Sequence, residues 1–311
     1  MENLYFAASE EARALSFAAL VKNRFSDQLH AQIHQYAKWH NIELQSITLT
    51  DVIVTAMERD AVYANVLFSC TVGEQERVIP ASYVIDCFFS TNDGFSQVHV
   101  RCTSPAWPNR AQQAVLPDTL VPHLPKDQME TVARSILKEL YPTALRNAIP
   151  VSAISIALKL GLRVEYACVD LRDETLGMIF FEDSTIAVYD TIEEISRIMN
   201  VKRGTILINR RSDGKFDPRV NNNTILHECI HWILHKPAYL LQKAYDPRLS
   251  AIACRRFSSV QRSDTWTAFD WMEWQANSLA PRLLMPEWST RMQTDRMLRR
   301  MENLDPKFRM G

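Results

Sequence analysis

The segment His227-Glu228-Cys229-Ile230-His231 is an H-E-x-x-H motif, and it constrains this chain more than any other feature. Apolar residues flank it on both sides, which predicts a helix. On a helix, residues four apart lie on one face, so the imidazoles of His227 and His231 can converge on one metal ion. Glu228 lies one step round the helix, where its carboxylate can take a proton from a water molecule. The motif predicts a zinc hydrolase site; the alternative is a buried helix whose histidines hydrogen-bond to the backbone or to solvent.

A candidate third ligand, Glu273, lies on a second predicted helix. Apolar and small residues recur there at helical spacing from Trp271 to Ala280. Burying a carboxylate among such large apolar groups is costly unless a cation or hydrogen bonds compensate, so Glu273 is a candidate ligand. The alternative is an exposed glutamate at the rim of this helix. Asn277, one turn beyond on the same face, is a candidate for hydrogen bonding around the metal or else a surface amide.

A third histidine, His235, continues the helical series but is excluded from the metal by distance. It lies roughly 12 Å along the helix axis from His227, which is too far for one zinc ion with bonds of about 2 Å. We expect His235 to pack or cap near the end of the helix, which Lys236 and Pro237 are predicted to terminate.

Together these motifs resemble the ImmA/IrrE family of metallopeptidases. The resemblance rests on H-E-x-x-H at 227–231, on E-x-x-A-N and L-L-M-P between 273 and 286, and on Thr224, and it covers about residues 130–288. It implies a gluzincin-like zinc endopeptidase, with Zn²⁺ held by the two motif histidines and Glu273 and with Glu228 as general base. Several family members are intracellular regulators that cut a helix-turn-helix repressor, which implies a protein substrate of that kind.

Two segments depart from the family pattern. Asn221-Asn222-Asn223 stands where the family has a basic and aromatic run, and Cys229-Ile230 stands where it has Leu-Gly. Neither change touches a predicted metal ligand. Cys229 points to another face of the helix than Glu228, and we expect it to be a small buried apolar group rather than a nucleophile or a ligand.

The order of predicted elements indicates an α+β protein: a helical zinc-peptidase domain with a small sheet, preceded by a smaller α+β N-terminal domain. Residues 1–10 include Glu2–Phe6, which resembles most of a tag-protease recognition site, and we expect them to lie outside the fold. The N-terminal domain spans 11–104, a proline-rich connector spans 105–126, and the metallopeptidase domain spans 127–311. The role of the N-terminal domain is left open.

Within these domains, periodicity predicts individual elements. In the N-terminal domain a helix is expected at 27–39 and strands at 47–54, 63–72, 78–89 and 98–102. In the second domain periodicity predicts a helix at 126–140. The resemblance to the ImmA/IrrE family implies a further helix at 150–162 and strands at 163–166, 177–181 and 205–209. The strand ending at Asn209 is expected to take an extended substrate at its edge. The candidate oxyanion donors are Tyr239, Tyr245, Arg255 and Arg256.

Composition excludes several alternatives. The formal net charge of −1 gives no basic excess, so we expect no direct nucleic-acid partner. The six cysteines form no C-x-x-C pair, which argues against a cysteine zinc site. His30 and His34 form a second pair four residues apart, but no third ligand accompanies them, so they are assigned a surface or packing role.

We see no signal peptide and no apolar run long enough to cross a bilayer, so we expect a cytoplasmic protein without a membrane partner. The alternative to a peptidase is a pseudo-peptidase or sensor module that binds a protein partner without cleaving it.

Overall fold

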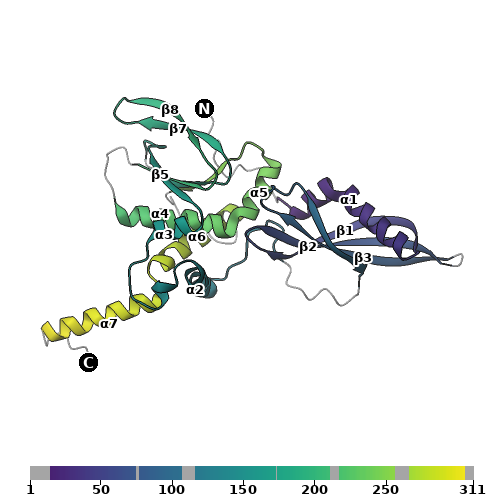
Figure 1. Ribbon diagram of the computed structural model, residues 1–311, viewed down its shortest axis with the longest axis horizontal. Helices are drawn as coiled ribbons and strands as arrows, with labels where there is room; N and C mark the ends of the chain where they lie inside the picture. The colour runs from purple at the N-terminus through teal and green to yellow at the C-terminus, as the bar shows by residue number, and fades with distance from the viewer. Residues whose placement is uncertain are drawn as a thin grey trace. The chain divides into compact units, whose positions relative to one another are not determined.

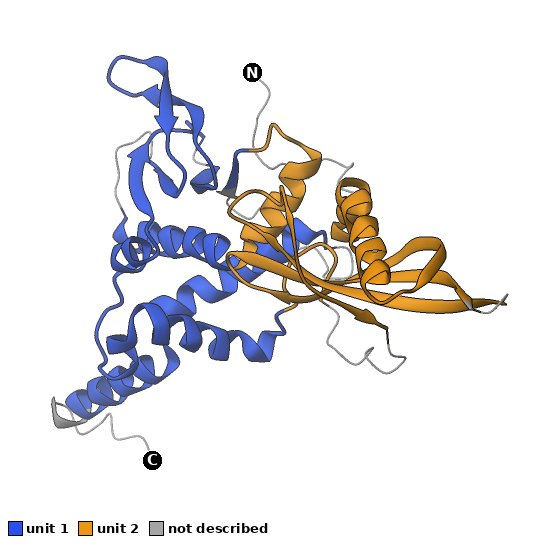
Figure 2. Ribbon diagram, turned by 45° about the vertical axis from the view of Figure 1, so that its right-hand side comes forward, with its two compact units in different colours: residues 1–7, 124–233, 250–311 blue, residues 8–123, 234–249 orange. Residues whose placement is uncertain are grey.

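The computed structural model describes residues 15–74, 77–106, 116–172, 174–210, 217–255 and 266–304. They form a mixed α+β protein with small sheets, in agreement with the predicted class (Figure 1). The chain divides into two compact units (Figure 2). Unit 1 comprises residues 1–7, 124–233 and 250–311, and unit 2 comprises residues 8–123 and 234–249. Glu2–Phe6 lies outside the described residues.

Unit 2 is a helix packed on an antiparallel meander (Figure 1). The helix is α1 (Phe17–Trp39), and the strands, in sheet order, are β1 (Glu43–Met57), β2 (Ala61–Glu74), β3 (Arg77–Ser90) and β4 (Val98–Pro105). The four predicted strands are confirmed. Helix α1 begins before its predicted start because Ser16 caps it, its hydroxyl accepting a hydrogen bond from the Ala19 amide at 2.9 Å. Its apolar face meets the sheet, where the Phe17 and Phe89 rings lie 5.1 Å apart.

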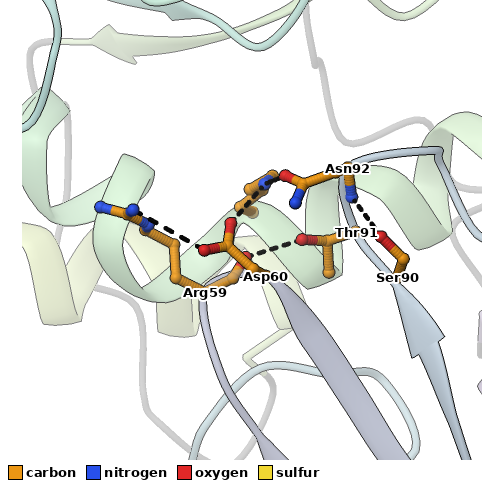
Figure 3. Close-up of polar contacts among 6 residues, drawn as sticks. Arg59, Asp60, Ser90, Thr91 and Asn92 are labelled. Carbon is orange, nitrogen blue, oxygen red and sulfur yellow. Dashed lines mark hydrogen bonds and ion pairs between the residues drawn. The ribbon is translucent and has the colours of Figure 1, made fainter.

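The segment 234–249 also belongs to unit 2, although the predicted boundaries placed it in the second domain. It holds helix α5 (Lys236–Tyr245), which follows a π-helical turn at His231–His235. The buried Lys236 ammonium donates to Asn92 Oδ1 at 2.9 Å and to Asp60 Oδ1 at 3.2 Å. Figure 3 shows Asp60 and Asn92 side by side at the ends of the neighbouring strands. As predicted, the helix that carries the motif stops before Lys236, and a new helix begins there.

Unit 1 contains one four-stranded sheet and a separate two-stranded hairpin. The sheet has the order β10 (Ala251–Arg255), β6 (Thr175–Phe180), β9 (Thr205–Asn209) and β5 (Arg163–Ala167). The hairpin consists of β7 (Ser184–Asp190) and β8 (Ile195–Val201). Strand β9 pairs in parallel with β5 and antiparallel with β6. The predicted substrate edge at Asn209 is therefore wrong, because hydrogen bonds already occupy both sides of β9.

Five α-helices are described in unit 1: α2 (Met129–Leu140), α3 (Ala153–Lys159), α4 (Pro218–Ile230), α6 (Ala268–Leu284) and α7 (Glu287–Leu304). Helix α4 packs on strands β6, β9 and β10 and against α3 and α6. Two short 3₁₀ turns, at Lys126–Gln128 and Pro142–Leu145, flank α2. None of the helices in the described ranges is long and apolar enough to span a membrane.

Helix α4 comes close to the sheet at Gly177 on β6. A Cβ atom there would lie 2.6 Å from Thr224 Cγ2 of α4. Since ordinary carbon–carbon contacts are about 3.5–4.0 Å, only glycine lets the helix come this close.

Candidate metal centre

The two histidines of the H-E-x-x-H motif converge at the C-terminal end of α4. Asp217 caps this helix, accepting from the Arg219 amide at 2.9 Å, and Pro218 occupies its first turn. His227 lies in its last turn and His231 directly follows it. Their Nε2 atoms are 3.0 Å apart, as expected for two residues one helical turn apart that face the same point.

Helix α6 brings Glu273 to the same point. A capping box between Thr267 and Asp270 fixes the start of α6 and so places Glu273 in its early turns. Its Oε1 lies 3.1 Å from His231 Nε2, and its Oε2 lies 3.4 Å from His227 Nε2. The three ligand atoms all lie within 4.8 Å of one another. Within the described part of the chain, this is the only group of three or more candidate ligands that meets this spacing.

The spacing of these atoms fits a small tetrahedral metal ion. Two ligands bonded at about 2.0–2.1 Å to a tetrahedral centre lie about 3.3 Å from each other. The three contacts between the side chains span 3.0–3.4 Å. Two imidazole nitrogens and one carboxylate oxygen, with a fourth position left over, also form a donor set found in catalytic zinc sites.

Burial sets the charge state of the site. His227, His231 and Glu273 are 1%, 0% and 4% exposed. Burial lowers the pKa of His231, which favours the neutral imidazole that metal binding requires. Burial alone would raise the pKa of Glu273, but the His227 charge and hydrogen bonds from both histidines outweigh it and hold that pKa well below its usual range. A buried carboxylate that stays ionised calls for a cation beside it.

Glu228 and Cys229 lie in the same turn of α4 but outside the ligand group. Both side chains are fully buried. Burial, together with the nearby Glu228 charge, raises the pKa of the Cys229 thiol, so its thiolate is suppressed. The expectation that Cys229 is a small buried group is confirmed. Glu228 is therefore a carboxylate close to the ligands in sequence that is not itself a member of the cluster.

Asn277 lies on α6, one turn beyond Glu273, as the sequence predicts. Its side chain is half-buried, and its Nδ2 atom is buried without a hydrogen-bond partner among the described residues. This amide is available as a donor near the centre.

The remaining candidates are a third histidine, two tyrosines and two arginines. His235 is buried at the end of the π turn and is not a member of the ligand cluster, in line with the distance argument. The hydroxyls of Tyr239 and Tyr245 donate to the carbonyls of Leu249 and Ser16. The side chain of Arg255 and all of Arg256 lie outside the described residues.

His30, the first residue of the N-terminal histidine pair, makes packing and hydrogen-bond contacts. His30 Nδ1 lies 2.7 Å from the Ser26 carbonyl oxygen, and its ring packs edge-on against Phe68 at 5.2 Å. The packing role predicted for His30 is confirmed.

The π turn at His231–His235 is the feature of the site that periodicity missed. Pro237 is the signal that could have revealed it. A proline has no N–H to donate to the carbonyl of residue i−4, here Ile233, and its ring clashes with that carbonyl. The α-helical ladder therefore fails directly after the second histidine, and a wider turn replaces it.

Comparison of this chain with protein-family models, with curated proteins and with solved structures finds no match.

Proposed function

We propose that this chain is a zinc-dependent endopeptidase of the ImmA/IrrE type. It would act in the cytoplasm on a specific protein, such as a helix-turn-helix repressor. One observation carries the proposal: two imidazole nitrogens and one carboxylate oxygen lie within 4.8 Å of one another, from two different helices. The H-E-x-x-H motif supplies two of these ligands and places Glu228 beside them.

In this proposal His227, His231 and Glu273 hold Zn²⁺. Zinc in such a site polarises a substrate carbonyl and lowers the pKa of an attacking water. The Glu228 carboxylate accepts the proton of that water as its oxygen bonds to the carbonyl carbon. It then passes the proton to the amide nitrogen as the C–N bond breaks, so the products are one acid and one amine.

An extended peptide would add to strand β10 rather than to β9. Strand β10 pairs only with β6 among the described residues, and it packs against α4, which carries the two histidines. Strand addition at a free sheet edge orients a peptide through main-chain hydrogen bonds and so places one peptide bond at a fixed position.

The depth of the site supports a second candidate function. All three ligands are less than 5% exposed, as in structural metal sites that are closed to solvent. In that case the chain is a pseudo-peptidase that binds a protein partner, and the metal only stabilises the fold.

A matched pair of variants distinguishes the two functions. Glu228→Gln removes the base without touching a ligand, and Glu287→Gln changes an exposed glutamate of α7 as the control. Each protein is prepared without chelator, its zinc content is measured, and it is incubated with candidate helix-turn-helix regulators with and without chelator. We expect about one zinc per chain in all three proteins, and defined fragments from all but Glu228→Gln.

Cleavage by Glu228→Gln at the wild-type rate would refute the role of Glu228. Stoichiometric zinc without cleavage of any regulator would favour the pseudo-peptidase. Absence of bound zinc, with no loss of stability in chelator, would refute the metal centre itself.

A further inference from the structure

The metal ligand His231 lies where regular helix geometry ends. Its amide N–H is shared between the carbonyls of Glu228 and His227, and the next turn, His231–His235, is π-helical. A π turn has i→i+5 hydrogen bonds in place of the i→i+4 bonds of an α-helix, so the regular ladder that runs through His227 does not continue past His231. Another interaction has to hold the backbone of His231 in place.

Trp232, the next residue, makes that interaction. It is 9% exposed, and its ring stacks on Phe181 with centroids 5.3 Å apart and an angle of 19° between the planes. The guanidinium carbon of Arg203 lies 5.9 Å from the centroid of the same ring. All three residues belong to unit 1, as does the metal cluster.

Hydrogen bonds also connect the residues around the Trp232 ring to neighbouring strands and turns. Gly204, with φ +77°, allows the tight turn between β8 and β9, and its N–H donates to the Phe180 carbonyl at 2.8 Å. Asp183 accepts from the Arg203 amide at 2.9 Å and from the Lys202 ammonium at 2.7 Å. These hydrogen bonds tie the residues around the Trp232 ring to the ends of strands β6, β8 and β9.

We propose that Trp232 is a positioning residue for the metal centre. Clamped by Phe181 and Arg203, it holds His231 in ligating position across the π turn. This inference rests on the proposed zinc site and adds a residue that touches neither metal nor substrate. Partners that orient a ligand typically change metal affinity by about 10–100-fold when removed, although they make no bond to the metal.

The test compares Trp232→Ala, Trp232→Phe and the control Trp39→Ala, whose indole is 73% exposed in unit 2. Zinc affinity is measured by chelator competition, and the coordination geometry is followed in the visible absorption spectrum of the Co²⁺-substituted protein. We expect Trp232→Ala to bind zinc about 10-fold more weakly, at the low end of the range for orienting partners, and to show a shifted Co²⁺ spectrum. Trp232→Phe keeps an aromatic ring on Phe181 and is expected to retain most of the zinc affinity and most of the wild-type Co²⁺ spectrum. Trp39→Ala is expected to match the wild type in both measurements.

A folded Trp232→Ala with wild-type zinc affinity and Co²⁺ spectrum would overturn the inference and leave the proposed function standing. A wild-type chain that binds no metal overturns both. If Trp232→Ala does not fold, Arg203→Gln decides, since it removes only the exposed cation. The loss of a cation–π contact then predicts about 2- to 5-fold weaker zinc binding, and unchanged binding overturns the inference.

Discussion

The contact between Gly177 and helix α4 allows a test of what sets the distance between α4 and the sheet. In Gly177→Ala the new Cβ would lie 2.6 Å from Thr224 Cγ2 and 3.3 Å from both Ile208 Cδ1 and the Leu207 carbonyl oxygen. Ordinary contacts are about 3.5–4.0 Å, so α4 or β6 must move by about 1 Å. Overpacking of this kind costs about 1–3 kcal/mol. Replacing glycine by alanine also gains about 0.4–1 kcal/mol from the less flexible unfolded chain. We therefore expect a net loss of about 1–2 kcal/mol in the free energy of unfolding.

A second substitution shows whether the clash is the cause. Thr224→Ser removes the clashing methyl group and keeps the hydroxyl that donates to the Val220 carbonyl at 2.9 Å. Alone it should cost about 0.8 kcal/mol for one buried methyl group. In the double variant the alanine Cβ fills the space of that methyl group. The loss of stability in the double variant should therefore be smaller than the sum of the two single losses by about 1 kcal/mol. The rescue stays incomplete because the Leu207 carbonyl belongs to the backbone and cannot move aside.

Urea unfolding of the wild type, the two single variants and the double variant measures this coupling. Gly73→Ala is the matched control, because a Cβ there meets only the flexible side chains of Gln45 and Glu43, at 3.1 and 3.2 Å. It should be close to neutral. Additive losses in the double variant, or a neutral Gly177→Ala, would refute the argument that glycine sets the distance between β6 and α4.

Three further outcomes follow from the same structure. Asp60→Asn leaves the buried Lys236 ammonium without its charged partner at 3.2 Å. It should lower the free energy of unfolding by about 1–2 kcal/mol, and by less in high salt. Equal urea midpoints for the variant and the wild type would contradict this. Cysteine reactivity is measured with a thiol reagent at pH 8. Cys102→Ser should lower the number of fast-reacting thiols by one, because Cys102 is exposed. Cys229→Ser should leave that number unchanged, because burial raises the pKa of the Cys229 thiol. Burial raises the pKa of Asp170, but main-chain N–H groups donating to its carboxylate outweigh this and lower it overall. Its stabilising effect is therefore full above the unfolded value of about 3.9 and is lost as the pH falls through the lower folded value. Asp170→Asn should thus destabilise the protein at pH 7 and cost less at pH 3; an equal loss at both pH values would rule out this carboxylate as the cause.

Most of the local structure follows from patterns that the sequence displays. The strands of unit 2 alternate apolar and polar residues, and strand β9 is a short apolar run, so each is visible in a window of a few residues. The residues of the candidate metal cluster are visible for the same reason. A four-residue spacing on a helix fixes the relative positions of His227 and His231, and a carboxylate among large apolar residues marks Glu273.

Elements whose existence depends on distant partners were missed. Strand β10 has five residues and exists because β6, which is distant in sequence, lies beside it. The sequence of a strand does not show whether it lies at the edge or in the interior of a sheet. For this reason the prediction that β9 has a free side is wrong.

By itself, the sequence determined the H-E-x-x-H helix, the three residues of the candidate metal cluster and the α+β class, because helical spacing and residue chemistry are local properties. Only the tertiary structure decided that Glu273 of α6 reaches both histidines, that residues 234–249 join unit 2, and that Trp232 is clamped at the π turn. Each of these depends on packing between segments far apart in sequence. Such packing is decided by shape and burial across the whole fold and leaves no periodic mark in any one segment.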